Sequence, residues 1–174
     1  MSSSPPFPET DAEIEAMVRG LVAAKCAAVE GTGHVFTQRF YVVGKQAYVD
    51  KLGIESSADG NYEVRCLFVE FVGYEDLAKG CEDAPHYHLI YSMRAVQEFA
   101  DVREDESSSS QEFAAYVMNL RAAFLTARDL GFPARLHHEP LSMDERIRID
   151  DDEMTGVFGH IAPFVLKVEV VPNG

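Results

Sequence analysis

The fold is decided by an apolar stretch at residues 159–171, GHIAPFVLKVEVV. Apolar and polar residues alternate along it, as they do in a strand with one buried face. Pro163 is typical of the start of a strand or of a sheet edge. The side chains expected to point inward are those of Phe164, Leu166, Val168 and Val170. A strand so late in the chain has to pair with strands made from earlier segments, so it indicates scaffold rather than an active site.

A helix is predicted just before this strand, at residues 109–130. Ser109 and Glu112 have the spacing of a capping box, and Gly131 with Pro133 ends the periodic pattern. Apolar residues recur at steps of three and four, which indicates one buried stripe. The residues of this stripe are Phe113, Tyr116, Val117, Leu120, Phe124 and Ala127.

A second amphipathic helix is predicted near the N-terminus, at residues 11–30. Thr10 and Glu13 again have capping-box spacing, and Gly31 with Gly33 is a stop signal. Its buried stripe is expected to contain Ile14, Met17, Val18, Leu21, Val22, Cys26 and Val29. The two helices therefore each present one apolar side to a common core.

Long strands are predicted at residues 62–77 and 86–99, forming an antiparallel pair. The first of them becomes nearly continuously apolar, which is typical of a strand covered on both faces. A shorter strand is favoured at 35–41, one or two helical turns at 44–53, and a short strand at 146–149 before an acidic turn. On the second long strand, the side chains expected on one face are Tyr87, Leu89, Tyr91, Met93 and Ala95.

The elements together predict an α+β fold with a single, mainly antiparallel β-sheet and two principal helices packed on one face. We expect one domain at residues 10–174, preceded by a flexible arm at 1–9 that is rich in serine and proline. Residues 55–61 and 101–110 have the composition of exposed loops.

The charge of the chain limits its ligands. The formal net charge is -14, and the lysines and arginines form no cluster, which argues against a nucleic acid as a specific ligand. No basic leader and no apolar run of membrane-spanning length is present, so neither secretion nor membrane insertion is expected. Cys26, Cys66 and Cys81 are odd in number and lack CxxC spacing, which favours a reducing, intracellular compartment.

The sharpest metal candidate is the pair His86 and His88, because an HxH pair on a strand directs both imidazoles to one side. With Gly80 the pair resembles the opening of the cupin pattern, but Ser92 and Met93 stand where a cupin has its glutamate. A half-exposed edge of the sheet is the favoured interpretation of the pair.

The other chemically active side chains also fit structural roles. His137 and His138 are adjacent, so a strand would send them to opposite faces, and His160 is expected to be partly buried with a backbone partner. Cys26 and Cys66 lie on apolar stripes, while the acidic surroundings of Cys81 would raise its thiol pKa. The carboxylates at 101–106 and 150–153 have the pattern of solvated loops. No catalytic, cofactor-binding or metal-binding residue is assigned.

Laid in order, the elements resemble those of the tail terminator proteins of long-tailed bacteriophages, which are also described as tail-to-head joining or tail completion proteins. The segments that carry the likeness are the capped helix at 11–30, GHVFTQRFYV, HYHLIYSMRAV, QEFAAYVMNLRAAFLTARDLG and IRIDDDEMTGVFGHIAPFVLKVEVV. The likeness spans residues 11–171 and lies in element order rather than in a catalytic motif.

The resemblance implies a structural virion protein that is not an enzyme and needs no cofactor. Such a subunit forms a hexameric ring on the last ring of the tail tube, stops tube growth and meets the head-completion or connector protein. It is assembled in the host cytoplasm and lies at the tail or neck of the virion, away from any membrane. DNA passes through the lumen without specific binding, which the acidic balance suits. Loops 77–85 and 101–110 are the expected partner contacts.

Two alternatives remain open. The first is a small metal-binding enzyme or binding domain that uses His86 and His88, with His160 as a third ligand, and it predicts a stoichiometric metal. The second is an intracellular adaptor or immunity-type protein of the same fold class, which would be a monomer or a dimer. The mass of the purified protein and its metal content separate the three hypotheses.

Overall fold

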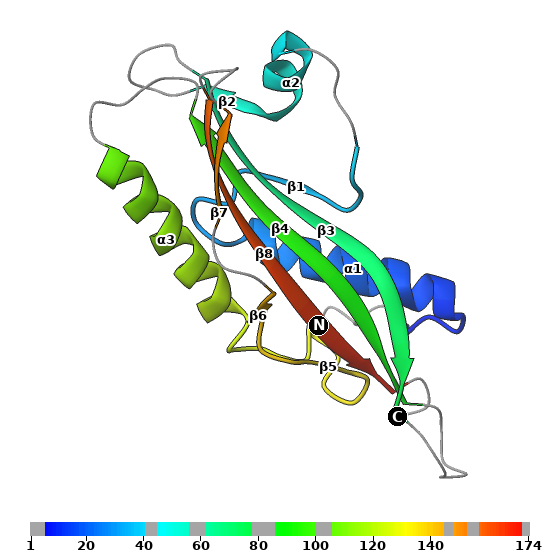
Figure 1. Ribbon diagram of the computed structural model, residues 1–174. Helices are drawn as coiled ribbons and strands as arrows, with labels where there is room; N and C mark the ends of the chain where they lie inside the picture. The colour runs from blue at the N-terminus through cyan, green and yellow to red at the C-terminus, as the bar shows by residue number, and fades with distance from the viewer. Residues whose placement is uncertain are drawn as a thin grey trace, which may run out of the picture.

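The computed structural model describes residues 6–40, 45–55, 62–77, 86–99, 106–144, 148–152 and 157–171. Over these ranges the chain forms three helices and eight strands (Figure 1). The elements are α1 (Asp11–Ala27), β1 (His34–Phe36), α2 (Lys45–Leu52), β2 (Gly53–Glu55), β3 (Tyr62–Asp76), β4 (Tyr87–Phe99), α3 (Glu106–Ala123), β5 (Leu136–His138), β6 (Ser142–Met143), β7 (Arg148–Asp152) and β8 (Val157–Val170).

The strands form one curled sheet in the order β1-β3-β4-β8-β5. β2 also pairs with β3, and β6 and β7 also pair with β8. Every pairing is antiparallel except that of β1 with β3. The predicted α+β class with a mainly antiparallel sheet is therefore confirmed.

The last strand, β8, lies inside the sheet rather than at its edge. It pairs with β4 along one side, from Phe158 opposite Phe99 to Val170 opposite Tyr87. Along its other side it pairs in turn with β7, β6 and β5. The expectation that this strand is joined to earlier strands is confirmed.

Pro163 occupies the middle of β8, so the expectation that it marks a strand start or a sheet edge is wrong. It falls between the part of β8 that pairs with β7 and the part that pairs with β6. Its carbonyl oxygen accepts a hydrogen bond from the Asp144 amide at 3.1 Å. Because neither β7 nor β6 pairs at this position, the missing proline N–H breaks no ladder bond on that side.

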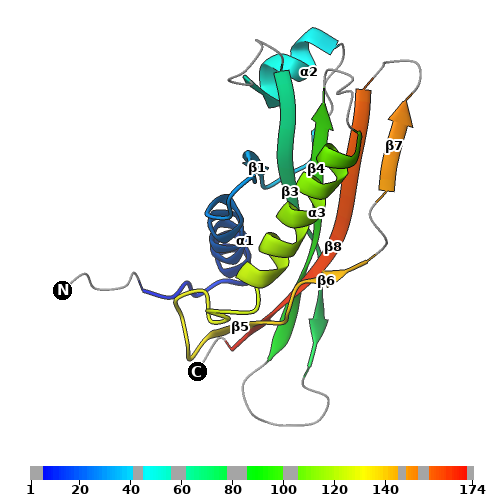
Figure 2. The same cartoon turned by 90° about the vertical axis from the view of Figure 1, so that its left-hand side faces the viewer.

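The main core lies between the sheet and two helices. α1 packs over β3 and β1, while α3 packs over β8, both on the same face (Figures 1 and 2). The predicted inward residues of β4 and β8 are all buried there, as are Ile14, Val18, Val22 and Cys26 of α1. The prediction of two principal helices on one face is thereby confirmed. α3 contributes Phe113, Tyr116, Val117, Leu120 and, just after its end, Phe124.

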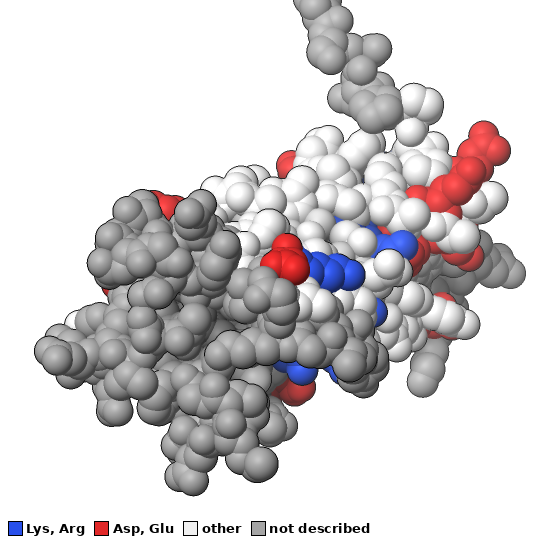
Figure 3. All heavy atoms as spheres, turned by 90° about the horizontal axis from the view of Figure 1, so that it is seen from above, with Lys and Arg blue, Asp and Glu red and all other residues white. Residues whose placement is uncertain are grey.

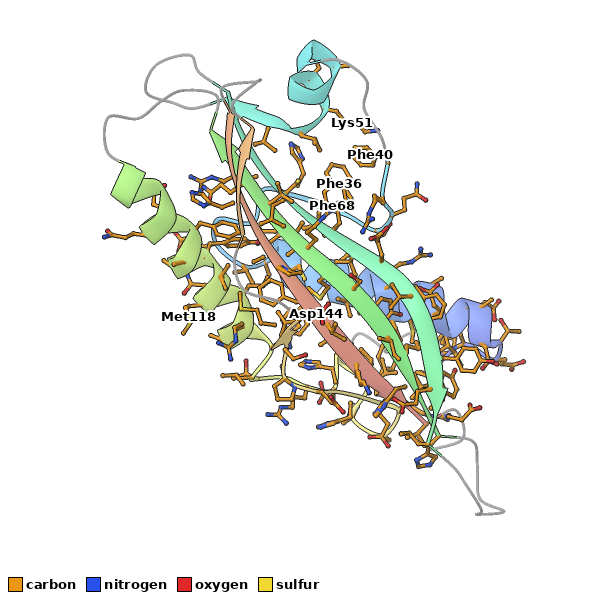
Figure 4. The ribbon with its side chains drawn as sticks, in the orientation of Figure 1. Phe36, Phe40, Lys51, Phe68, Met118 and Asp144 are labelled. Carbon is orange, nitrogen blue, oxygen red and sulfur yellow. The ribbon has the colours of Figure 1, made fainter. Side chains whose placement is uncertain are left out.

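A smaller apolar cluster covers part of the opposite face. Phe36 packs against Phe40 and Phe68, with ring centroids 4.7 and 5.5 Å away (Figure 4). The Lys51 ammonium lies 3.7 Å from the centroid of the Phe40 ring, in a cation–π contact. The buried members of this cluster are Leu52, Val64, Cys66, Phe68 and Val96. It attaches the end of α2 to the sheet, and the predicted helical turns at 44–53 are confirmed as α2.

The N-terminal cap of α1 is the predicted capping box. The Glu13 amide donates to Thr10 Oγ1 at 3.4 Å, and the Thr10 amide donates to Glu13 Oε2 at 3.3 Å. Before the cap, Phe7 packs edge-on against Phe132, with ring centroids 5.6 Å apart, and Arg135 lies over the Phe7 ring. This part of the predicted arm therefore lies against the domain, while residues 1–5 are outside the described residues.

The bounds of α3 differ from the prediction at both ends. The helix begins at Glu106, so the predicted cap at Ser109 and the predicted loop over 106–110 are wrong. Residues 106–110, ESSSS, have the composition of a loop, because serine favours caps and turns, and this explains the error. The helix ends at Ala123 rather than at 130, and the segment that follows contains two residues with positive φ, Ala127 at 47° and Leu130 at 50°.

The turn after α3 is held by Lys25 of α1, a residue that is far from the turn in the sequence. The Lys25 ammonium donates to the carbonyl oxygens of Thr126 and Ala127 at 2.7 and 2.8 Å. These bonds satisfy carbonyl groups beyond the helix end, so the chain leaves the helical path despite its continued apolar spacing. Burial lowers the pKa of the Lys25 ammonium.

The short strands were the least well predicted elements. β2, β5 and β6 were not expected at all, and β1 ends at Phe36, before most of the predicted span 35–41. β7 includes Asp150 to Asp152, which were expected in an acidic turn. These aspartates pair with Gly159, Phe158 and Val157 of β8, so pairing between distant segments decided their conformation.

Candidate functional site

His86 and His88, the metal candidates, face separate carboxylates. His86 Nδ1 lies 3.5 Å from Glu169 Oε1, and His88 Nδ1 lies 4.0 Å from Glu75 Oε2, which is too long for a hydrogen bond. Glu75 also pairs with the Lys167 ammonium at 2.8 Å. Within the described ranges, no group of three or more His, Cys, Asp or Glu side chains is placed to hold a metal ion. The two imidazoles therefore take part in separate cross-strand contacts.

Of the other histidines, His138 and His160 pack against aromatic rings in the protein interior. His138 is fully buried and its neighbour His137 is exposed, which confirms that they point to opposite faces of a strand. His138 Nδ1 lies 2.8 Å from the Glu139 carbonyl oxygen, and its ring packs edge-on against Phe124. His160 is buried and stacks on Phe113, with centroids 5.4 Å apart. Burial lowers the pKa of both buried imidazoles.

The lowered pKa of His138 predicts a loss of stability in acid. Its folded-state pKa lies below the ordinary value of 6.5, so the unfolded chain binds the proton more readily. The stabilisation from the neutral His138 is fully present above pH 6.5, and it is lost as the pH falls from there toward the folded-state pKa. Between pH 7.5 and 5.5 we expect the free energy of unfolding, measured with urea, to fall, and a single imidazole such as His138 contributes at most about 1.4 kcal/mol per pH unit to that fall.

The matched control is the exposed neighbour on the same strand. His138→Gln should remove that part of the pH dependence, whereas His137→Gln should leave it unchanged. An equal pH dependence in the wild type and in the His138→Gln variant would contradict the assignment. The contribution of His160 remains in both variants, so the comparison isolates one imidazole.

The described cysteines belong to the two cores. Cys26 and Cys66 are free thiols and both are buried, as expected, while Cys81 lies outside the described residues. Burial raises the pKa of the Cys26 thiol to about 12. A thiol with so high a pKa is a poor nucleophile at neutral pH.

A groove of about 620 Å³ lies between the first turns of α1, the last part of β3 and the first residues of β4. It is a concave site, formed by described residues, that could receive a ligand or partner. We call it the acidic groove. Its carboxylates are those of Asp11, Glu15 and Asp76, and its rings are those of Phe71, Tyr74 and Tyr87.

The polar groups of the acidic groove are partly fixed by neighbours. Tyr87 Oη donates to Asp11 Oδ1 at 3.0 Å, and the Arg19 guanidinium lies 3.3 Å from Glu15. Burial, with Asp11 beside it, raises the pKa of the Tyr87 hydroxyl, which stays protonated and continues to donate. Carboxylates beside aromatic rings attract a cationic group, above all a guanidinium.

The outer edge of β3 adjoins the acidic groove. β2 and β1 pair with β3 only as far as Phe68, and beyond it no strand of the described residues pairs on this side. The register shift between Phe71 and Gly73 marks a β-bulge. Val72 is 59% exposed and Tyr74 68% exposed. The expectation that this strand is covered on both faces is therefore wrong for its last third, which presents an open apolar edge.

A second exposed apolar surface lies on the far side of α3. Met118 is 59% exposed and points away from the sheet, and Leu125, just after the helix, is 57% exposed (Figure 4). Three exposed alanines lie on the same side, together with Arg121. We call this surface the α3 outer face. Its residues are Ala114, Ala115, Met118, Arg121, Ala122 and Leu125.

These two surfaces belong to elements that lie on different sides of the molecule. In Figure 1, α3 lies at the left of the molecule, while the first turns of α1 and the lower part of β3 lie at the right. Sequence periodicity identifies the exposed side of α3, because Met118 and Ala122 fall opposite the buried stripe. The acidic groove had no comparable signal, since its walls come from segments that are far apart in the sequence.

Comparison with known proteins identifies no family. No protein-family model matches the chain, and no curated protein matches its sequence. Among the described helices, none has the length and apolar composition needed to cross a membrane.

Proposed function

We propose that this chain is a structural subunit that assembles head to tail into a ring. The observation that carries the proposal is the placement of two unlike surfaces, the acidic groove with its open edge and the α3 outer face, on elements at opposite sides of one molecule. A contact between unlike surfaces is heterologous, and repeated rotation closes such contacts into a ring.

The ring is proposed to be the tail terminator of a long-tailed bacteriophage. The mainly antiparallel sheet with two helices on one face supports this assignment, because it is the fold expected from the resemblance. Six copies would cap the tail tube, stop its growth and meet the head-completion or connector protein at the neck of the virion. The proposed role is mechanical, and the surfaces that carry it are protein contacts.

The charge of the chain suits a ring through which DNA passes. The net charge of -14 disfavours phosphate binding, since phosphates are held by clusters of Lys and Arg. On the face seen in Figure 3, acidic and basic side chains are interspersed, so no basic field is present among the described residues there. DNA would therefore slide past the subunits rather than adhere to them.

The mass of the purified protein tests the ring. Light scattering and native mass spectrometry should give six times the chain mass of 19.3 kDa, and negative-stain images should show a central hole. A chain that stays monomeric at every concentration would contradict the proposal. A stoichiometric metal lost on replacing His86 and His88 by alanine would favour the metal-binding alternative instead.

The position of the ring in the virion is tested by a separate experiment. Particles produced by cells that encode this chain should contain it, and gold-labelled antibodies against the chain should mark the junction of head and tail. Labelling along the whole tail, or no labelling of intact particles, would exclude a terminator at the neck. Whether the chain forms a ring would still be decided by the mass measurement.

A further inference from the structure

We infer that the contact between neighbouring copies is made by the α3 outer face of one copy lying in the acidic groove of the next. This inference rests on the proposed ring and names the contact that closes it. Arg121 of one copy would meet the carboxylates of the groove, while Met118 and Leu125 would cover its aromatic rings.

The apolar residues of the α3 outer face have the spacing of a helix that binds in a groove. Met118, Ala122 and Leu125 stand at positions i, i+4 and i+7. Their small neighbours Ala114 and Ala115 are exposed as well, so a partner surface can approach this side of α3 closely. A groove of about 620 Å³ is large enough to receive several side chains.

The charges of the two surfaces are complementary. The acidic groove contains three carboxylates, of which Glu15 is paired with Arg19 of its own helix at 3.3 Å. Arg121 is exposed and forms no ion pair within the part of the chain that the structure describes. A guanidinium can pair with a carboxylate and stack on an aromatic ring at the same time, and Asp76 and Tyr74 offer both.

The contact also overcomes the repulsion between like-charged copies. A chain of net charge -14 repels a second copy unless opposite charges meet locally. Arg121 is the charged residue of the α3 outer face, so this side brings a positive charge to the carboxylates of the acidic groove. The open edge of β3, with Val72 and Leu77, would lie at the rim of the contact.

Two single substitutions test the contact. Tyr74→Glu changes the groove and Met118→Glu changes the helix face; both side chains are exposed, so the fold should survive. Each variant alone should be monomeric under conditions in which the wild type forms rings. Gln38→Glu, which adds the same charge at an exposed residue that belongs to neither surface, should form rings like the wild type.

A mixture of the two variants distinguishes a head-to-tail contact from a contact between two identical surfaces. The Met118→Glu copy keeps an intact groove and the Tyr74→Glu copy keeps an intact helix face, so one contact can form between them. Native mass spectrometry should therefore find a heterodimer of twice 19.3 kDa and nothing larger. A mixture that stays monomeric would show that the two surfaces do not meet.

A charge exchange provides the second test. Asp76→Arg and Arg121→Asp should each raise the concentration needed for assembly about tenfold or more, and the double variant should restore it. Asp144→Arg, exposed and outside both surfaces, is the charge-matched control. If the wild type forms rings and every variant does too, the inferred contact is wrong and the proposed ring stands. If the wild type is monomeric, the proposed ring itself fails.

Discussion

Replacing Phe164 by alanine should lower the free energy of unfolding by about 3–5 kcal/mol. Phe164 is fully buried in the middle of β8, opposite Met93 of β4 and Met143 of β6. Both neighbouring strands and the helix layer surround the ring, so little can move in to fill the space that the ring leaves. Guanidinium unfolding followed by circular dichroism gives the difference directly.

The neighbouring residue supplies the control for this prediction. Val165 points to the other face of the sheet, lies opposite Ser92 and is only partly buried. Val165→Ala should cost about 1 kcal/mol, because few contacts are lost there. A cost for Phe164→Ala as small as that of Val165→Ala would mean that β8 does not lie at the centre of the core.

Replacing Gly33 by alanine should cost about 3 kcal/mol or more, from backbone strain and steric overlap together. Gly33 has a φ of +67°, which favours glycine. An added Cβ would collide with the Arg65 carbonyl oxygen and lie 2.7 Å from the Arg65 Cβ. The backbone of β3 is held by its neighbouring strands and cannot move aside.

The variant Gly131→Ala separates the two contributions to the cost of Gly33→Ala, which are backbone strain and steric overlap. Gly131 has a φ of +87°, but a Cβ built there meets nothing within 4 Å. Gly131→Ala should therefore cost only the backbone strain, about 1 kcal/mol. Thermal unfolding of the two variants side by side measures the steric part as the difference. Equal costs would show that the close approach of the chain at Gly33 to β3 is not rigid.

The long elements could be predicted because their own residues specify them. Helix α1 has a cap and a buried stripe within one segment, and β4 and β8 alternate with period two along their length. The short strands could not be predicted in this way. β5 and β6 contain three and two residues, and they are strands only because β8 lies beside them.

The candidate site could be predicted only in part. The exposed side of α3 follows from the spacing of its buried residues, so Met118 could have been recognised as an outward apolar residue. The acidic groove depends on how the start of α1 meets the end of β3 and the start of β4, and no local pattern encodes that arrangement. The expected partner loops at 77–85 and 101–110 lie mostly outside the described residues, and the part at 106–110 is helix.

The interior position of β8 also sets the order in which the protein can form during translation. β3 and β4 leave the ribosome early and can pair at once, because they are neighbours in the sequence. β5, β6 and β7 emerge after α3, but their described partner is β8, which is synthesised after all of them. Until then the side of β4 that β8 will occupy stays open on the nascent chain. The sheet is therefore completed only when the last strand has left the ribosome, and during that interval the growing polypeptide exposes the kind of unpaired edge that promotes aggregation.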